Sequence, residues 1–264
     1  MKKTHFAIVT GASSGMGVEF ARQLAQRGYN LLIVSNEERI HEVAKEIQSS
    51  FSSDQRPIEV IPLVMDLGKQ SSARELYEYA REHEIEVEVL VNNAGVYHDR
   101  DILDDSEGFT SLIINLHMYT PAMLCYLFGQ DMKARRKGYI LNVCSVTDKM
   151  AAQRLGTYGG TKAFLSHFTR ALHIELRQYG VHVTNVSPGA VDTGLYNIKP
   201  AFTKIGKCLG IIVSPQTLAR RGLRAMFRGR AKTTVPTLFW RALTFIITLI
   251  PTWMLRLIRR FGWF

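Results

Sequence analysis

The sequence predicts a doubly wound α/β fold, in which helices cover both faces of a parallel sheet. Short apolar runs, rich in β-branched residues, alternate along the 264-residue chain with longer amphipathic segments. The apolar runs are continuous, as expected of strands that are buried on both faces of a sheet. Hydrophobic residues make up 46% of the chain and nothing in it resembles a linker, which predicts one large domain.

The predicted elements alternate in the order that such a fold requires. The expected strands are residues 6–9, 30–34, 58–64, 87–91, 139–143 and 181–186, with a short last strand at 233–235. The expected helices are residues 15–27, 37–49, 70–82, 109–132, 157–179 and 215–227. Right-handed crossovers between parallel strands then place helices on both faces of the sheet. We expect residues 1–236 to form the domain and residues 237–264 to form a C-terminal amphipathic helical extension.

A glycine-rich turn follows the first predicted strand and opens the first predicted helix. Residues 10–17 read Thr-Gly-Ala-Ser-Ser-Gly-Met-Gly. The first glycine permits a tight turn, the second lets the backbone approach a pyrophosphate, and the third lets the helix pack on the sheet. The pattern predicts a dinucleotide site, and the alternative is a loop that binds nothing. The residues expected to contact the cofactor here are Gly11, Ser13, Ser14, Gly15, Met16 and Gly17.

Two further groups of polar residues follow predicted strands. Asp66 comes directly after the third strand, where it either accepts a hydrogen bond from an adenine amino group or is an exposed loop carboxylate. Asn93, Ala94 and Gly95 follow the fourth strand. Ligands of open α/β sheets bind at the carboxyl ends of the strands. We therefore expect this second segment to support the glycine-rich turn or to contact the adenosine ribose.

Tyr158 and Lys162 are one helical turn apart and share a face of a predicted helix. The ammonium of the lysine could therefore lower the pKa of the tyrosine phenol, making it a proton donor or acceptor near neutral pH. Ser145 follows the fifth strand and could donate a hydrogen bond to a substrate oxygen. Taken singly, these residues are equally consistent with a buried tyrosine, a surface lysine and a turn serine. Together with a dinucleotide site they predict hydride and proton transfer.

This ordered set of motifs resembles the short-chain dehydrogenase/reductase family over residues 4–236. The resemblance implies a Rossmann fold and an NAD(P)-dependent enzyme that interconverts a ketone and a secondary alcohol. It implies that Tyr158 is the general acid, that Lys162 also binds the nicotinamide ribose, and that Ser145 binds the substrate oxygen. It makes Asn115 the fourth catalytic residue, with a helix-bending core asparagine as the alternative. The residues that it places beside the nicotinamide are Pro188, Gly189, Val191 and Thr193.

The residues at the end of the second strand bear on the choice of cofactor. In the family an acidic residue there binds the ribose 2′-hydroxyl of NAD, and a basic residue just after it binds the 2′-phosphate of NADP. Here the two positions are Ser35 and Asn36, followed by Glu37 and Glu38, so neither expected charge is present. Because Ser13, Ser35 and Asn36 could hydrogen-bond a phosphate without a counter-charge, we predict NADP(H) over NAD(H).

The net charge of +10 resides in the last part of the chain. Thirteen of the 33 Lys and Arg residues lie after Asp192, where no Asp or Glu occurs. In residues 238–260 the polar side chains fall at helical spacing, and the longest uncharged run, 242–255, is too short to span a bilayer. We expect a peripheral anchor on the inner face of a membrane, with a dimer interface or packing onto the core as the alternatives. Interleaved Leu, Ile and Phe favour lipid over nucleic acid as its partner.

The substrate is expected to be hydrophobic. The extension resembles the tails of the lipid-acting reductases of the family, such as very-long-chain 3-oxoacyl and 3-ketosphinganine reductases, which implies a long-chain lipid substrate. Residues 195–214, apolar among lysines, are expected to form a mobile lid over an apolar channel. The alternatives are a hydroxysteroid or small-ketone dehydrogenase and a non-catalytic nucleotide-sensing protein.

Other features bear on compartment and partners. The three cysteines are too few and too irregularly spaced for a disulfide framework or a zinc site, and the eight histidines form no metal-ligand pattern. The amino terminus lacks the pattern of a signal peptide, which predicts a cytoplasmic location. The sequence leaves a homo-oligomer open.

Overall fold

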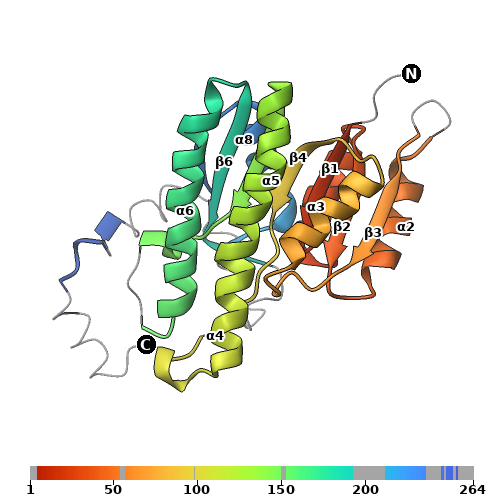
Figure 1. The fold of residues 1–264 in the computed structure, drawn as a ribbon. Coiled ribbons are helices and arrows are strands. Elements are labelled where there is room, and N and C mark those ends of the chain that lie inside the picture. The colour runs from red at the N-terminus through yellow and green to blue at the C-terminus, as the bar shows by residue number, and fades with distance from the viewer. Residues whose placement is uncertain are drawn as a thin grey trace.

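Seven strands form one sheet in the structure, a computed structural model that describes residues 5–53, 57–97, 99–149, 153–192, 212–235, 245–246, 248–251 and 254 (Figure 1). In chain order the strands are β1 (Phe6–Thr10), β2 (Asn30–Ser35), β3 (Val60–Val64), β4 (Val87–Asn92), β5 (Gly138–Val143), β6 (Val181–Pro188) and β9 (Lys232–Val235). Two further short strands, β7 (Ala190–Val191) and β8 (Ile212–Val213), pair with each other.

The sheet has the order β3-β2-β1-β4-β5-β6-β9, and every neighbouring pair is parallel. The chain therefore runs outward from β1 through β2 to β3, and then returns to the other side of β1 with β4. This reversal between β1 and β4 is the point at which ligands bind in open α/β sheets, beyond the carboxyl ends of the strands. The predicted doubly wound fold is confirmed.

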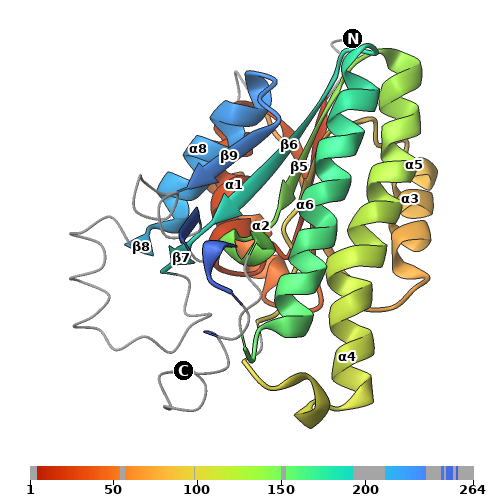
Figure 2. The ribbon, with the colours of Figure 1, turned by 90° about the vertical axis from the view of Figure 1, so that its left-hand side faces the viewer.

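Helices cover both faces of the sheet (Figure 2). They are α1 (Gly15–Ala25), α2 (Ile40–Phe51), α3 (Ser72–Glu82), α4 (Glu107–Ile114), α5 (Thr120–Arg135), α6 (Gly156–Arg177) and α8 (Pro215–Phe227). Successive residues of a strand point to opposite faces, so β1 contributes to two cores. Ala7 and Val9 belong to the core under α1, α2 and α8, whereas Phe6 and Ile8 belong to the core under α3, α5 and α6.

The predicted helix at 109–132 is interrupted in the structure. Between α4 and α5 lies a π-helical turn, η2 (Asn115–Tyr119), in which the Thr120 N–H donates to the Asn115 carbonyl five residues earlier. An α-helix would make this bond to the residue four positions back. Such a turn accommodates one additional residue and changes which side chains face inward beyond it, and π turns are frequent at functional sites.

Two predictions about the carboxyl-terminal part lie largely outside the described residues. They are the lid at 195–214, of which 212–214 are described, and the extension at 237–264, of which 245–246, 248–251 and 254 are described. Within the described part of the chain, the helical stretch Glu107–Arg135 is long and apolar enough to cross a membrane. Half of its most apolar window is buried within the protein, as in a core helix of a globular domain.

Candidate active site

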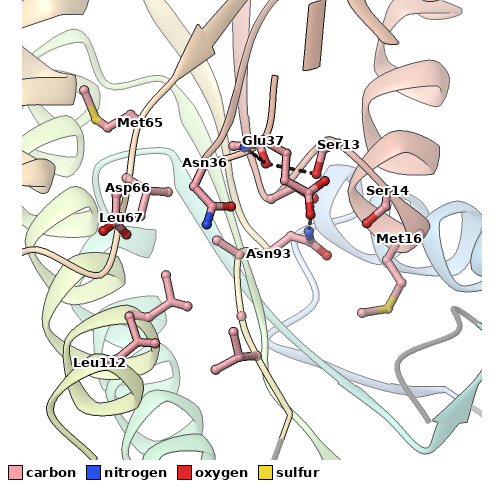
Figure 3. Close-up of a pocket in the computed structure, with 17 residues that line it drawn as sticks. Ser13, Ser14, Met16, Asn36, Glu37, Met65, Asp66, Leu67, Asn93 and Leu112 are labelled. Carbon is pink, nitrogen blue, oxygen red and sulfur yellow. Dashed lines mark hydrogen bonds between the residues drawn. The ribbon is translucent and has the colours of Figure 1, made fainter. Parts of the chain in front are cut away.

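The larger of two adjoining cavities lies at the reversal of strand order and has a volume of about 310 Å³. Figure 3 shows Ser14 and Met16 on one side of it and Asp66 and Leu112 on the other. We refer to it as the cofactor pocket. The sequence-predicted residues that line it are Gly11, Ser13, Ser14, Gly15, Met16, Ser35, Asn36, Asp66, Asn93, Ala94 and Gly95.

Hydrogen bonds from the segment after β4 hold the glycine-rich turn. The Asn93 amide nitrogen donates to the carbonyls of Thr10 and Gly11, at 2.9 and 3.1 Å. The Thr10 hydroxyl in turn accepts from the backbone N–H groups of Asn93 and Ala94, each at 3.0 Å. The expectation that this segment supports the turn agrees with these contacts. The amide oxygen of Asn93 is buried and has no hydrogen-bond partner among the described residues.

Two glycines of the turn are required by sterics. Gly11 has a φ of +65°, and a Cβ there would lie 2.7 Å from the Ala94 Cα. Gly17 does not line the pocket, but a Cβ on it would collide with the backbone of Gly11 and Ala12. The backbone at the start of α1 therefore comes close to the turn, and its N–H groups can cradle a phosphate.

The end of the pocket beside β2 is polar and uncharged at its base. The Ser35 hydroxyl donates to the Ser13 hydroxyl at 2.9 Å, and both side chains are buried. The Glu37 N–H donates to the Ser35 hydroxyl at 3.3 Å, which leaves Asn36 and Glu37 exposed at the rim. The carboxylate that binds an NAD ribose in the family is therefore replaced by two linked hydroxyls.

A second, smaller cavity of about 50 Å³ adjoins the first and shares Met16, Asn93, Gly95 and Val96 with it. We refer to it as the catalytic pocket. The sequence-predicted residues that line it, besides the shared ones, are Ser145, Tyr158, Lys162, Pro188, Gly189 and Val191. Thr193 lies outside the described residues. The structure therefore brings residues from α6 and from the ends of β5 and β6 together next to the cofactor pocket.

Lys162 is buried on α6, and its ammonium lies 5.8 Å from the centroid of the Tyr158 ring. Its Nζ donates to the Val143 carbonyl at 3.1 Å. Burial lowers the pKa of Lys162 from 10.5 to about 8, because removal of water disfavours the charged form. The lysine therefore exchanges its proton closer to neutral pH than an exposed lysine does.

Ser145 and Tyr158 are both nearly buried in the same cavity. The Ser145 hydroxyl oxygen accepts from the Thr147 N–H at 3.2 Å, which leaves its O–H available for a substrate oxygen. The Tyr158 ring makes edge-to-face contacts with Tyr97 and with His117, at centroid distances of 5.4 and 5.6 Å. These contacts fix the plane of the phenol ring.

Asn115 is not among the residues that line either pocket. It begins the π turn and is half-buried. His117, two residues later, is 1% exposed and lines the catalytic pocket. Sequence reasoning missed His117 because it predicted one uninterrupted α-helix over residues 109–132. The π turn changes which positions of that segment face inward. A signal was present, since a histidine within an apolar helix segment requires buried partners.

The sequence matches the profile of the short chain dehydrogenase family over residues 5–201. The chain belongs to that family. Family membership, together with the dehydrogenase and reductase relatives, makes it an NAD(P)-dependent oxidoreductase acting on C=O and CH–OH groups.

Curated relatives and solved structures extend this family assignment. The chain is 30% identical to human "Inactive hydroxysteroid dehydrogenase-like protein 1" over 94% of its own length and 73% of that protein. It is 31% identical to "Very-long-chain 3-oxoacyl-CoA reductase" of Aspergillus terreus, over 86% of this chain and 62% of that one. A short-chain dehydrogenase from Sphingobium yanoikuyae in complex with NADPH has a similar fold, with a TM-score of 0.76 and 24% identity over 93% of this chain and 96% of that chain.

Proposed function

We propose that the protein interconverts a ketone and a secondary alcohol on a hydrophobic, long-chain lipid with NADP(H). The observation that carries the proposal is the convergence of Ser145, Tyr158 and Lys162 on the catalytic pocket, which adjoins the cofactor pocket. The residues present fit a dinucleotide, because the glycine-rich turn lines the cofactor pocket and has no room for side chains at Gly11 and Gly17, so that its backbone N–H groups can bind a phosphate.

The chemistry follows from the roles of these three side chains. When bound, the dinucleotide supplies the hydride that adds to the carbonyl carbon. The Ser145 hydroxyl orients the carbonyl oxygen and stabilises the charge that develops on it. The Tyr158 phenol gives its proton to that oxygen, and the Lys162 ammonium stabilises the phenolate that remains. In the direction of alcohol oxidation the phenolate accepts the proton instead.

The preference for NADP(H) rests on the residues at the end of β2. The Ser13 hydroxyl accepts from Ser35 and keeps its own O–H, so that it and the Asn36 amide at the rim can donate to a 2′-phosphate, and the strand ends without an acidic residue. The Sphingobium neighbour carries NADPH and a sorbose reductase from Gluconobacter frateurii is likewise complexed with NADPH. Glu37 also lines the pocket and opposes the phosphate, so we expect moderate discrimination.

The lipid substrate class is supported by relatives. Very-long-chain 3-oxoacyl-CoA reductases of Aspergillus terreus and Podospora anserina are 31% and 33% identical to the chain. The competing substrate class is a hydroxysteroid, because the human relative at 30% identity is named as hydroxysteroid dehydrogenase-like. That relative is also named inactive. The present chain has both Tyr158 and Lys162 in its catalytic pocket, which supports an active enzyme.

A substrate panel tests the proposal. Purified protein would be assayed with long-chain 3-keto thioesters, long-chain 3-keto amines, keto-steroids and short soluble ketones, each with NADPH and NADH. We expect turnover of a long-chain substrate with NADPH. Turnover of keto-steroids alone would assign a steroid, instead of a long-chain lipid, as the substrate. Binding of NADPH without turnover of any ketone would favour a nucleotide-sensing protein.

We propose further that the C-terminal extension docks on the inner face of a membrane and brings the active site to its lipid substrate. Two observations support this: the chain has no acidic residue after Asp192, and Phe245, Ile246 and Leu249 are exposed in the described part of the extension. Basic residues beside exposed apolar ones suit an anionic lipid surface. Packing onto a second copy of the chain is the alternative.

Co-sedimentation with liposomes distinguishes membrane docking from packing onto a second copy of the chain. Full-length protein should bind anionic vesicles at low salt, and a chain that ends at residue 237 should not, with activity on long-chain substrates falling more than activity on short ketones. A truncation that lowers the molecular mass in light scattering, without any change in vesicle binding, would indicate an oligomer interface instead.

A further inference from the structure

His117 is a buried titratable residue in the catalytic pocket to which the reaction described above gives no role. Its side chain is 1% exposed, and it is the middle residue of the π turn between α4 and α5. It also borders a second small cavity, together with Lys162 and Thr120. A buried imidazole beside a buried lysine needs a specific arrangement of hydrogen bonds to be stable.

The hydrogen bonds of His117 determine which ring nitrogen carries the proton. The Val96 N–H lies 3.0 Å from Nε2, and a backbone N–H can act only as a donor. Nε2 must therefore be the unprotonated acceptor. In a neutral ring the proton is then on Nδ1, which donates to the Thr161 hydroxyl at 3.2 Å.

The chain of donors continues from His117 to the catalytic tyrosine. The Thr161 hydroxyl donates to the carbonyl of Tyr158 at 2.8 Å. Every bond from Val96 through His117 and Thr161 to Tyr158 thus runs in one direction. This chain joins the loop after β4, which lines the cofactor pocket, to the first turn of α6, which carries the phenol.

Packing and charge favour the same neutral ring. The His117 ring meets the Tyr158 ring edge to face, and a Cβ on Gly95 would lie 2.8 Å from Nε2, so that position leaves no room for a larger side chain. Burial, and secondly the charge of Lys162, hold the pKa of His117 well below its usual value. A proton on Nε2 would also oppose the Val96 N–H. The imidazole therefore remains neutral and is unsuited to be the proton donor.

We propose that His117 is a positioning residue: its neutral Nδ1–H form fixes the first turn of α6 against the loop after β4, and so sets the place of the Tyr158 phenol. The inference rests on the proposed function, since it assigns the phenol as proton donor. It gives the π turn a purpose, because that turn is what directs residue 117 into the pocket.

Two substitutions at this position test the proposal. In His117→Gln the amide oxygen is as many bonds from Cβ as Nε2 is, so it can still accept from Val96, whereas His117→Leu has no acceptor. We expect His117→Leu to lower kcat by about 10²-fold, as displacement of a catalytic group by roughly 1 Å does. We expect His117→Gln to recover most of that loss, and NADPH affinity from fluorescence titration to remain at the wild-type value in both variants.

A matched control is His173→Leu. His173 is also buried on the domain's interior, and its Nδ1 donates to the Val183 carbonyl at 2.8 Å, but it lines neither pocket. This variant should lose stability and keep its kcat. If it lost kcat as His117→Leu does, the effect would be one of general destabilisation and the proposal would be wrong.

A second measurement does not depend on activity. Long-range proton–nitrogen NMR spectra of protein with ¹⁵N-labelled histidine report the tautomer of each ring, and the signal missing from His117→Gln identifies His117. We expect a neutral Nδ1–H ring that does not titrate in the pH range around 6.5 in which an exposed histidine does. An Nε2–H ring, or one that titrates in this range, would overturn the proposal.

The kinetic outcomes distinguish the two levels of inference. If the wild-type protein is active and His117→Leu has the same kcat, the role of His117 is wrong and the proposed function stands. The same holds if kcat falls equally in His117→Leu and His117→Gln. A wild-type protein that turns over no ketone with either cofactor would overturn the proposed function and the role of His117 together.

Discussion

The cofactor pocket and the catalytic pocket adjoin each other, but they are assembled differently. The cofactor pocket, of about 310 Å³, is built mainly from segments that directly follow β1, β2, β3 and β4. The catalytic pocket, of about 50 Å³, combines the ends of β5 and β6 with α6 and the π turn. The first depends mainly on backbone conformation after consecutive strands, and the second on buried side chains that only the packing of distant segments brings together.

This difference predicts how each pocket responds to substitution. Where backbone shape decides, an added methyl group should prevent binding and leave the chemistry of bound molecules unaffected. Where buried side chains decide, a substitution should impair turnover and leave dinucleotide binding intact. Four variants, from the largest expected effect to the smallest, test this division.

Tyr158→Phe should reduce turnover most. It removes the proton donor and leaves the aromatic ring in place, so we expect kcat to fall by about 10²- to 10⁴-fold. Affinity for NADPH should stay at the wild-type value in fluorescence titration. Tyr126→Phe, at an exposed tyrosine of α5, is the control and should behave as wild type. Near wild-type reduction by Tyr158→Phe would refute the proposed mechanism.

Gly17→Ala should impair dinucleotide binding. The new Cβ would collide with the backbone of the glycine-rich turn, and relief of such overpacking costs up to about 3 kcal/mol, or about 10²-fold in NADPH affinity. Gly108→Ala is a matched control, because Gly108 also lies in the first turn of a helix but a Cβ there meets nothing within 4 Å. Equal NADPH affinity in the two variants, measured by titration, would show that the turn tolerates displacement.

Lys162→Met should change how stability depends on pH. The folded protein holds the pKa of Lys162 at about 8, below the 10.5 of an exposed lysine, so the unfolded chain binds the proton more tightly. The wild-type free energy of unfolding therefore gains a contribution as pH rises from about 8 to 10.5, and loses it as pH falls through that window.

In Lys162→Met this contribution is absent. We expect the free energy of unfolding of the variant minus that of the wild type, measured with urea, to decrease by on the order of 2 kcal/mol between pH 7 and pH 10. Lys45→Met, at an exposed position of α2, is the control for the loss of a lysine charge at the surface. Parallel pH curves for wild type and Lys162→Met would mean that the lysine is well solvated.

Asn36→Arg should have the smallest effect, at the rim of the cofactor pocket. A guanidinium there can bind the 2′-phosphate with a charge-assisted hydrogen bond worth about 1.5 kcal/mol, which would raise the preference for NADPH over NADH about tenfold. The ratio of kcat/KM for the two cofactors measures it, with Asn36→Gln as the uncharged control. A wild-type protein that prefers NADH would instead assign the ribose to Glu37.

Much of the fold followed from local pattern. Every predicted strand lies within two residues of the observed bounds at both ends, because continuous apolar runs rich in β-branched residues are typical of strands buried on both faces of a parallel sheet. The helix predicted at 37–49 begins instead at Ile40, after a turn over the residues that follow β2. Propensity does not determine such boundaries, since helix ends depend on local capping and hydrogen bonding.

The sequence by itself determined the alternation of strands and helices and the glycine-rich turn, because each is encoded by residues that are neighbours in the chain, and the order of its motifs along the chain determined the family. The order of the strands in the sheet came from the structure. The sequence also named Ser145, Tyr158 and Lys162, whose meeting in one cavity the structure shows. Only the tertiary structure decided that Asn115 stays out of the pockets and that His117 enters. A π turn exchanges one set of backbone hydrogen bonds for another with little trace in the hydrophobic period, so only packing against Val96 and Thr161 reveals which residue faces inward.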